Sequence, residues 1–372
     1  MQERVEILDY PSDPAVAKKF LEKLKAVSLQ YQEKNGRRPA IMEVCGSHTM
    51  SLARTGLKTI LKDYINLISG PGCPVCVTDQ ISIDAMIELA EGENRIICTF
   101  GDMMRVPGTK RSLMEAKTAG RDIRVVYSPL DAITIAEENP DKQVIFLGIG
   151  FETTIPILAA TLKAADEKNI ANFSMWITTK LVEPILRALL DGGEVNIDAF
   201  LLPGHVSIVL GKNSYDFLTT EYGVPGVISG FESVEMISGL YILVKMLLNE
   251  EVQIVNDHKK IVTDEGNTYA QELMHHYLEP VDEAWRGIGV IAKSGLDIRK
   301  EYEHLNAKKR FNIEVGEPKK TKCRCGEVIS GLISPNECSL FDKACHPINP
   351  IGPCMVSTEG SCAAYYQYMR ED

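Results

Sequence analysis

Cysteine is the residue type that most directly indicates chemistry in this sequence of 372 residues. Six of the ten cysteines lie between Cys323 and Cys362, and three more occupy two glycine-rich turns near the N-terminus. Structural disulfides are rare in a reducing cytosol, so such clusters more often indicate metal binding or redox chemistry. Cys98, in the apolar run RIICTF, is expected instead to pack as a small buried hydrophobic residue.

The first of these turns is CGSH, residues 45–48. Cys45 is expected to end a strand, and His48 to lie in the first turn of the next helix. A helix N-terminus and a nearby imidazole both lower the pKa of a thiol, so this pair could bind iron or zinc or act as a nucleophile. A buried cysteine next to a surface histidine is the alternative.

The second turn is GPGCPVC, residues 70–76, in which Cys73 and Cys76 form a Cys-x-x-Cys motif. This motif is typical of a redox dithiol or of half a zinc site. A structural zinc site would need a second Cys/His pair at matching spacing, and only Cys45 and His48 could supply one through folding. The sequence therefore favours a redox dithiol.

Two further turns follow predicted strands and carry polar groups. GIGFETT, residues 148–154, places Glu152, Thr153 and Thr154 at a helix start. It lacks the lysine of a P-loop and the glycine spacing of a dinucleotide fingerprint, so these groups could serve acid–base or hydrogen-bonding roles around a polar ligand. PGHV, residues 203–206, places His205 after a strand, with a purely structural histidine as the alternative.

The C-terminal cysteines occur in three segments: CRCG (323–326), PNECSLFDKAC (335–345) and GPCMVSTEGSCAAYY (352–366). Their spacing fits no zinc ribbon of paired Cys-x-x-Cys motifs. Four thiolates can hold a [4Fe–4S] cluster, and the two remaining cysteines would suit electron exchange between the cluster and a disulfide. Zinc ions bound by the same thiolates are the alternative.

The elements that must position these turns follow from the hydrophobic pattern. Continuous apolar runs alternate with amphipathic helical patterns, which predicts parallel sheets covered on both faces. The carboxyl ends of parallel strands form a binding crevice, so the four turns are candidates for one shared site. The predicted strands are 40–45, 64–69, 95–100, 123–128, 143–150, 173–179, 198–204 and 224–230.

The fold class is therefore α/β, with two parallel-sheet domains and a mostly helical or irregular iron–sulfur domain. Two four-stranded units are predicted in preference to one large sheet. The irregular segment from about residue 316 would need a metal or crosslinks to hold it. The predicted division is a helical segment at 1–38, an α/β domain with CGSH and CPVC at 39–130, an α/β domain with GFETT and PGHV at 131–232, and a helical and iron–sulfur region at 233–372.

Composition excludes some classes of function. Fifty-one acidic residues against forty Lys and Arg give a net charge of −11, which argues against general nucleic-acid binding. The longest apolar stretch, at 237–248, is too short and too interrupted for a membrane-spanning helix. The first residues, MQERVEILDY, lack the apolar core of a signal peptide, so a cytoplasmic protein is expected.

Taken together, the motifs resemble those of the [NiFe]-hydrogenase maturation factor HypD family. The resemblance rests on CGSH, GPGCPVC, GFETT, PGHV, CRCG and GPCMVSTEGSCAAY, in that order, and runs from about residue 40 to the C-terminus. It implies a cytosolic scaffold on which the Fe(CN)2CO group of the hydrogenase is assembled. The implied partners are a HypC-type small chaperone and a HypE-type cyanide carrier, with a monomer expected outside the complex.

The resemblance also implies roles for individual residues. Cys45 would bind the iron together with a cysteine of the HypC-type partner, and His48 would lie beside that iron. Cys73 and Cys76 would be the redox dithiol, in a cleft lined by the remaining polar residues: Glu152, Thr153, Thr154 and His205. By comparison with ferredoxin–thioredoxin reductase, the [4Fe–4S] ligands would be Cys323, Cys338, Cys345 and Cys362, with Cys325 and Cys354 as a redox pair.

Two other interpretations remain at this point. An iron–sulfur thiol–disulfide oxidoreductase would explain the C-terminal cysteines and the Cys73/Cys76 pair, but not the convergence of the other turns. A zinc-stabilised interaction module without redox chemistry is the third interpretation. We expect an assembly scaffold with redox activity rather than a conventional turnover enzyme.

Overall fold

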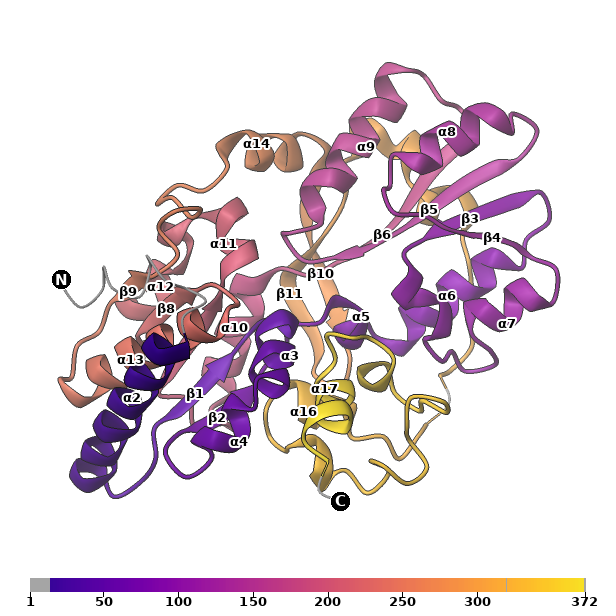
Figure 1. Cartoon of the computed structure of the whole chain (residues 1–372). Helices are drawn as coiled ribbons and strands as arrows, with labels where there is room; N and C mark the ends of the chain where they lie inside the picture. The colour runs from indigo at the N-terminus through magenta and orange to yellow at the C-terminus, as the bar shows by residue number, and fades with distance from the viewer. Residues whose placement is uncertain (1–13, 319, 371–372) are drawn as a thin grey trace.

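The computed structural model describes residues 14–318 and 320–370, and it has the predicted α/β fold (Figure 1). Its two main sheets are entirely parallel, and a two-stranded antiparallel hairpin runs between them. The cysteine-rich C-terminal segment lies beneath the centre of the molecule, against the N-terminal part of the chain. None of the helices in the described ranges is long and apolar enough to cross a membrane.

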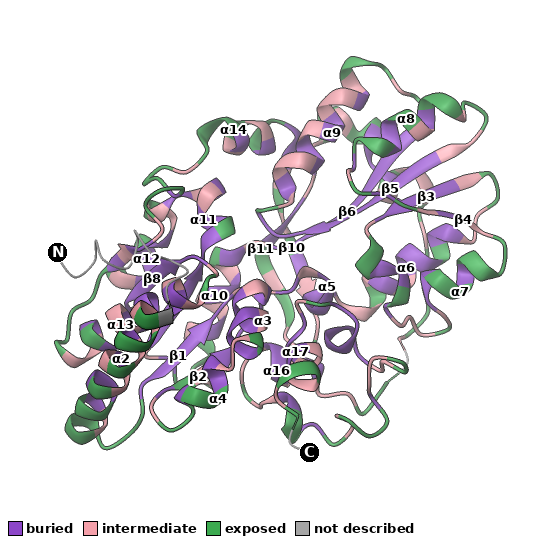
Figure 2. Ribbon diagram, viewed as in Figure 1, coloured by how far each residue is buried: buried purple, intermediate pink, exposed green. Residues whose placement is uncertain are grey.

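The first sheet has five strands in the order β2-β1-β7-β8-β9. Its central strands β1, β7 and β8 are buried along their whole length (Figure 2), as their continuous apolar sequences predict. Helices α2 and α13 pack against each other over one face of this sheet. The strands are β1 (Ala40–Glu43), β2 (Asn66–Ser69), β7 (Ala199–Pro203), β8 (Gly226–Ser229) and β9 (Ile254–Asn256).

The second sheet has four strands in the order β4-β3-β5-β6. Cys98 lies fully buried in β3, which confirms the interpretation of this residue as part of the core. The strands are β3 (Arg95–Thr99), β4 (Asp122–Val125), β5 (Gln143–Gly150) and β6 (Phe173–Thr179).

The helices follow the predicted alternation with the strands. Helix α2 buries Phe20, Leu24, Val27 and Tyr31 at helical spacing, and the preceding residues 1–13 of the predicted helical segment lie outside the described residues. The helices up to residue 277 are α2 (Pro14–Asn35), α3 (Gly46–Arg54), α4 (Leu57–Leu61), α5 (Pro74–Val77), α6 (Gln80–Ala90), α7 (Leu113–Thr118), α8 (Asp131–Glu138), α9 (Ile155–Glu167), α10 (Val182–Gly192), α11 (Gly204–Leu210), α12 (Asp216–Thr220), α13 (Ser233–Leu248) and α14 (Thr268–Tyr277), with 3₁₀ helices η1 (Gly101–Arg105) and η2 (Lys212–Tyr215).

Strand pairing groups the chain differently from the predicted boundaries. After β2 the chain leaves the first sheet, builds the whole second sheet, and returns at β7. Consequently the boundary at 130/131 falls inside the second sheet, and the first sheet combines residues 40–69 with residues 199–256. The reason is physical: apolar runs in both sheets have the same pattern, so they identify strands without identifying their partners.

A long antiparallel hairpin was not expected from the sequence. Strands β10 (Leu278–Trp285) and β11 (Gly289–Ile298) pair with a bulge between Val281 and Glu283. The segment NTYAQELMHHYLEP, residues 267–280, has the pattern of a single helix, but the helix stops at Tyr277 and the remaining residues begin β10. Short strand β9 was also not predicted.

The chain beyond the hairpin is largely irregular, as predicted. Its helix α17 packs on α3, which begins directly after Cys45. The remaining elements are η3 (Lys300–Leu305), α15 (Ala307–Phe311), α16 (Cys325–Ile329), η4 (Pro335–Glu337), η5 (Pro353–Met355) and α17 (Ser361–Tyr368).

Candidate functional site

A cavity of about 230 Å³ lies where the carboxyl ends of strands from both sheets meet. The turns after β1, β2, β5, β6 and β7 all contribute to its wall, as expected for parallel sheets. The lining residues are Val44, Cys45, Ser47, Gly72, Pro74, Phe151, Thr153, Thr154, Val182, Pro203, His205, Val206 and Glu359. The four predicted turns therefore share one cavity.

Cys45 is the N-cap residue of α3 and is partly exposed to the cavity. Burial raises the pKa of its thiol to about 11, although the backbone N–H groups of His48 and Ser47 donate to the sulfur and oppose this shift. The expectation of a lowered pKa was therefore wrong, because desolvation outweighs the helix N-terminus. In the absence of a metal, Cys45 carries a neutral thiol at pH 7.

His48 lies behind the cavity rather than in its wall. Its ring is fully buried, and Nε2 is 2.9 Å from the carbonyl oxygen of Gly230. Burial lowers the pKa of His48 to about 4, so the imidazole is neutral and donates from Nε2. The ring of Phe231 packs against both His48 and His205. His205, in contrast, is exposed at the cavity, and burial of part of its ring lowers its pKa.

The GFETT turn divides its polar groups between the cavity and the protein interior. Thr153 and Thr154 line the cavity, whereas Glu152 is buried next to it. Glu152 Oε1 accepts a hydrogen bond from the backbone N–H of Val182 at 2.8 Å, and Oε2 has no hydrogen-bond partner among the described residues. Burial raises the pKa of Glu152 to about 7. This carboxyl therefore links the turn after β5 to the turn after β6.

Cys73 and Cys76 are joined by a disulfide at the start of the short helix α5. Neither sulfur lines the cavity, but the adjacent Gly72 and Pro74 do. A side chain at position 72 would lie 2.5 Å from the Cα atom of Cys45, so only glycine allows this approach. The disulfide loop is thus packed directly against the Cys45 backbone.

Glu359 is a lining residue that sequence reasoning missed. It follows η5 in the C-terminal segment, where it accepts a hydrogen bond from Ser47 Oγ at 3.0 Å. A side chain at Gly46 would meet its Cβ atom at 2.5 Å. Burial raises the pKa of Glu359. The two partners are 312 residues apart, and nothing in a single sequence indicates their contact.

A buried ion pair supports strand β1, which ends two residues before Cys45. Glu43, at the end of β1, accepts from Lys58 Nζ at 2.7 Å and from Ser69 Oγ at 2.9 Å. The ring of Tyr365, in α17, lies 5.3 Å from the Lys58 ammonium group. This network therefore links the strand before Cys45 to the helix that carries Cys362.

The six C-terminal cysteines line a second, smaller cavity. Cys325 Sγ and Cys354 Sγ are 2.9 Å apart, and the backbone N–H of Ile351 donates to Cys345 Sγ at 3.3 Å. Hydrogen bonding to Cys323 and Cys354 lowers the pKa of Cys325, and the same Cys325 contact raises the pKa of Cys354. Apolar neighbours complete the wall: Val328, Leu340, Phe341 and Met355.

This donor set fits an iron–sulfur cluster in its chemistry. Several soft thiolates converge in an apolar pocket with a backbone N–H donor to sulfur, which are the features that hold and tune such clusters. All six cysteine side chains line this one pocket, together with the apolar residues named above. Within the described ranges, no three His, Cys, Asp or Glu side chains are arranged around a single metal position.

The two cysteine systems are neighbours in space. Residues of α5 lie within 8 Å, Cα to Cα, of residues of α16, which begins at Cys325, and of η5, which contains Cys354. Figure 1 shows α5 directly above this C-terminal segment. The disulfide loop therefore lies between the first cavity and the Cys325/Cys354 pair.

Comparison with known proteins agrees with these motifs. The HypD family model, described as "Hydrogenase formation hypA family", matches residues 15–369. The chain is 41% identical over 337 residues to hydrogenase maturation factor HypD of Escherichia coli, covering 89% of this chain and 90% of the relative. It is 41% identical over 363 residues to HypD of Rhodobacter capsulatus (96% of both chains) and 39% identical over 355 residues to HypD of Cupriavidus necator (93% of both chains).

These matches and the fold define a hydrogenase maturation factor. The chain belongs to the HypD family.

Proposed function

We propose that this chain is the scaffold on which the Fe(CN)2CO group of [NiFe]-hydrogenase is assembled, with Cys45 holding the iron. The observation that carries this proposal is the single cavity shared by Cys45, Thr153, Thr154, His205 and Glu359. Low-spin iron that carries cyanide and carbon monoxide prefers a soft thiolate donor and polar groups around its diatomic ligands. The cavity combines one such donor with hydroxyl, imidazole and carboxyl groups.

Iron capture in this proposal is coupled to proton release from Cys45. The thiol is neutral at pH 7 because burial raises its pKa to about 11, so metal binding must displace its proton. Glu359 lines the same cavity and interacts electrostatically with the Cys45 sulfur, and it is the proposed proton acceptor. In this proposal His48 has an indirect role. Its hydrogen bond to Gly230 and its packing on Phe231 support the position of His205 in the cavity wall.

The partners in this proposal are those of the maturation machinery. A HypC-type small chaperone supplies a second thiolate to the iron, and a HypE-type carrier delivers cyanide. His205 and Thr153 are exposed at the cavity, so a partner has access from this side.

The C-terminal cysteines provide redox support in this proposal. Cys323, Cys338, Cys345 and Cys362 would hold the [4Fe–4S] cluster, and Cys325 with Cys354 would form the redox pair. When bound, the cluster supplies single electrons. The proximity of α5 to α16 and η5 supports transfer from this pair to Cys73–Cys76, next to Cys45.

An infrared spectrum of the protein purified together with its HypC-type partner tests the scaffold proposal. We expect cyanide and carbon monoxide stretching bands from iron bound to the complex. A complex that is loaded with iron but shows neither band would contradict the proposal.

A thiol–disulfide oxidoreductase is the second candidate function. Two observations favour it: the Cys325 and Cys354 sulfurs are 2.9 Å apart, and they lie near helix α5, which carries the Cys73–Cys76 disulfide. Rapid reduction of a generic protein disulfide by the reduced chain, without any partner, would support this function over the scaffold. A scaffold with internal redox chemistry is expected to show no such turnover.

A further inference from the structure

The tip of the β10–β11 hairpin lies between the disulfide helix α5 and helix α16. Thr78, directly after α5, forms an isolated bridge with Trp285. The backbone N–H of Arg286 donates to the carbonyl oxygen of Val77 at 2.8 Å. Because Val77 follows Cys76, this hairpin tip is fastened to the residue next to the disulfide.

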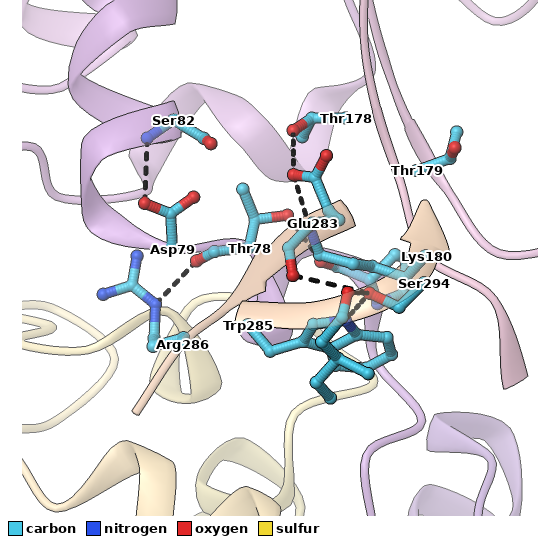
Figure 3. Close-up of polar contacts among 12 residues, drawn as sticks. Thr78, Asp79, Ser82, Thr178, Thr179, Lys180, Glu283, Trp285, Arg286 and Ser294 are labelled. Carbon is cyan, nitrogen blue, oxygen red and sulfur yellow. Dashed lines mark hydrogen bonds and ion pairs between the residues drawn. The ribbon is translucent and has the colours of Figure 1, made fainter. Parts of the chain in front are cut away.

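The Arg286 side chain strengthens this attachment. Its Nε donates to the carbonyl oxygen of Thr78 at 2.8 Å, and Nη1 donates to Gln80 Oε1 at 3.0 Å, as Figure 3 shows for Thr78. The third nitrogen, Nη2, is buried and has no hydrogen-bond partner among the described residues. A planar guanidinium fixes both partners at once, which a lysine ammonium cannot do.

The next residue along the hairpin contacts the other redox element. A side chain at Gly287 would overlap Gly326, and a side chain at Gly326 would lie 2.6 Å from the Cα atom of Gly287. Gly326 directly follows Cys325. Backbone therefore packs against backbone here, and Arg286–Gly287 connects the residue after Cys76 with the residue after Cys325.

The hairpin is also anchored next to its tip, through Glu283 and Trp285. Lys180, fully buried, forms an ion pair with Glu283 at 2.9 Å, and Thr178 Oγ1 donates to the same carboxylate at 3.1 Å (Figure 3). Trp285 Nε1 donates to Ser294 Oγ at 2.8 Å across the hairpin. The tip is consequently held in place relative to the second sheet.

We infer that Arg286 is a positioning residue that aligns the Cys73–Cys76 disulfide with the Cys325/Cys354 thiols for internal thiol–disulfide exchange. The inference rests on the redox relay of the proposed function. In the step, one thiolate of the Cys325/Cys354 pair attacks a sulfur of Cys73–Cys76, forming a mixed disulfide and releasing the other sulfur as a thiolate. The second thiol of the attacking pair then resolves it, leaving a Cys325–Cys354 disulfide and two thiols at Cys73 and Cys76. Two electrons move toward Cys45, the protons pass between the same sulfurs, and no other reagent is consumed.

The test traps the mixed disulfide in the full-length protein, purified without oxygen. Cys73→Ser and Cys76→Ser are each combined with Cys325→Ser or Cys354→Ser, so that one thiol remains in α5 and one in the C-terminal pair, and diamide then oxidises these two thiols to a disulfide. Non-reducing peptide mass spectrometry follows the rate of crosslinking. Adding Arg286→Gln is expected to slow it at least about ten-fold, because small misplacements of reacting groups cost large factors in rate. Gln80→Leu removes the Nη1 acceptor and the two hydrogen bonds that Gln80 Nε2 donates, to Asp84 and Pro107, but it keeps the bond between Arg286 Nε and Thr78, so it is expected to slow crosslinking less.

The matched control is Arg310→Gln, which removes a guanidinium that bonds Gln143 Oε1 and the carbonyl oxygen of Ala171. The crosslinking rate should not change in this variant. The equilibrium between Cys73–Cys76 and a dithiothreitol redox buffer should also be the same with Arg286→Gln as without it, since positioning changes the rate alone.

Each other outcome overturns the inference in a distinguishable way. Equal rates with and without Arg286→Gln would remove the role of Arg286 and leave the relay intact. A shifted dithiothreitol equilibrium would mean that Arg286 acts on disulfide stability rather than on alignment. No crosslink in any of the serine-substituted parents that keep Arg286 would contradict the relay itself, and with it this inference, while the role of Cys45 in iron binding would be unaffected.

Discussion

Gly72 lies directly against the backbone of Cys45, so the disulfide loop is packed tightly on the proposed iron ligand. A side chain at position 72 would lie 2.5 Å from both Cα and the carbonyl carbon of Cys45. The atoms it would meet belong to the backbone, which cannot move aside as a flexible side chain does. Close packing, rather than backbone conformation, therefore requires glycine here, since Gly72 is not in the left-handed region.

Gly72→Ala is expected to displace the disulfide loop and to lower the free energy of unfolding by about 1–3 kcal/mol, the usual cost of overpacking. Urea denaturation measures this change. Gly192→Ala is the control, because a side chain there meets nothing within 4 Å, and its stability should stay close to that of the unmodified protein. Equal stability of the two variants would show that the loop has space to move.

Cys45→Ala is expected to abolish cyanide-bearing iron in the complex with the HypC-type partner and to leave the C-terminal iron content unchanged. The reason is that Cys45 is the one thiol among the residues that line the first cavity. Infrared spectroscopy together with iron analysis checks both parts. Cys98→Ala serves as the matched control, since Cys98 is a free, fully buried cysteine in β3. Cyanide bands retained in Cys45→Ala would refute the role of Cys45.

All eight predicted strands are present in the structure, because each is a short apolar run bounded by turn residues. The sequence also predicted the shared cavity, since the carboxyl ends of parallel strands meet at one edge. The sequence did not reveal which strands belong to which sheet, because the pairing of β1 with β7 joins residues almost 160 positions apart. For the same reason Glu359 went unrecognised: its significance depends entirely on contact with Ser47 and Gly46.

Properties that depend on burial were also beyond the sequence. The motif CGSH indicates a thiol at a helix N-terminus, but only the packing around Cys45 decides that its pKa rises. The same applies to His48, which faces Gly230 instead of the cavity. Strand β10 was missed because its half-buried pattern, interrupted by Pro280, directly continues a true helix.

The six C-terminal cysteines give a prediction about metal. Protein purified without oxygen should be brown and contain about four irons, because a [4Fe–4S] cluster needs four thiolates. Serine substitutions at Cys323, Cys338, Cys345 or Cys362 should remove the iron, whereas Cys325→Ser and Cys354→Ser should retain most of it. Metal analysis and visible absorption measure both effects. Zinc in place of iron would contradict the cluster, and iron loss in Cys325→Ser would contradict the division into ligands and redox pair.

The raised pKa of Glu152 should make the free energy of unfolding depend on pH. Burial raises its pKa from the ordinary 4.5 to about 7, so the folded protein holds this proton more tightly than the unfolded chain does. The contribution of Glu152 to the free energy of unfolding must therefore fall as the pH rises from about 4.5 to about 7, by on the order of 3 kcal/mol. Glu152→Gln cannot ionise, and its amide oxygen can still accept from the Val182 N–H. We expect the variant to gain stability relative to the unmodified protein across this interval, with the difference constant above pH 7.

Chemical denaturation at half-unit steps between pH 4.5 and pH 8 measures that difference directly, and subtracting the two curves cancels every other titrating group, including buried His48. The control is Glu167→Gln, which neutralises an exposed carboxylate on the helix that follows the same turn. Its stability should stay within about 0.5 kcal/mol of that of the unmodified protein, because exposed surface substitutions usually have effects of this size. If the Glu152→Gln curve were flat, the carboxyl next to the cavity would be ionised and solvated at pH 7. It would then be a second anionic group beside the iron site instead of the neutral acid that burial predicts.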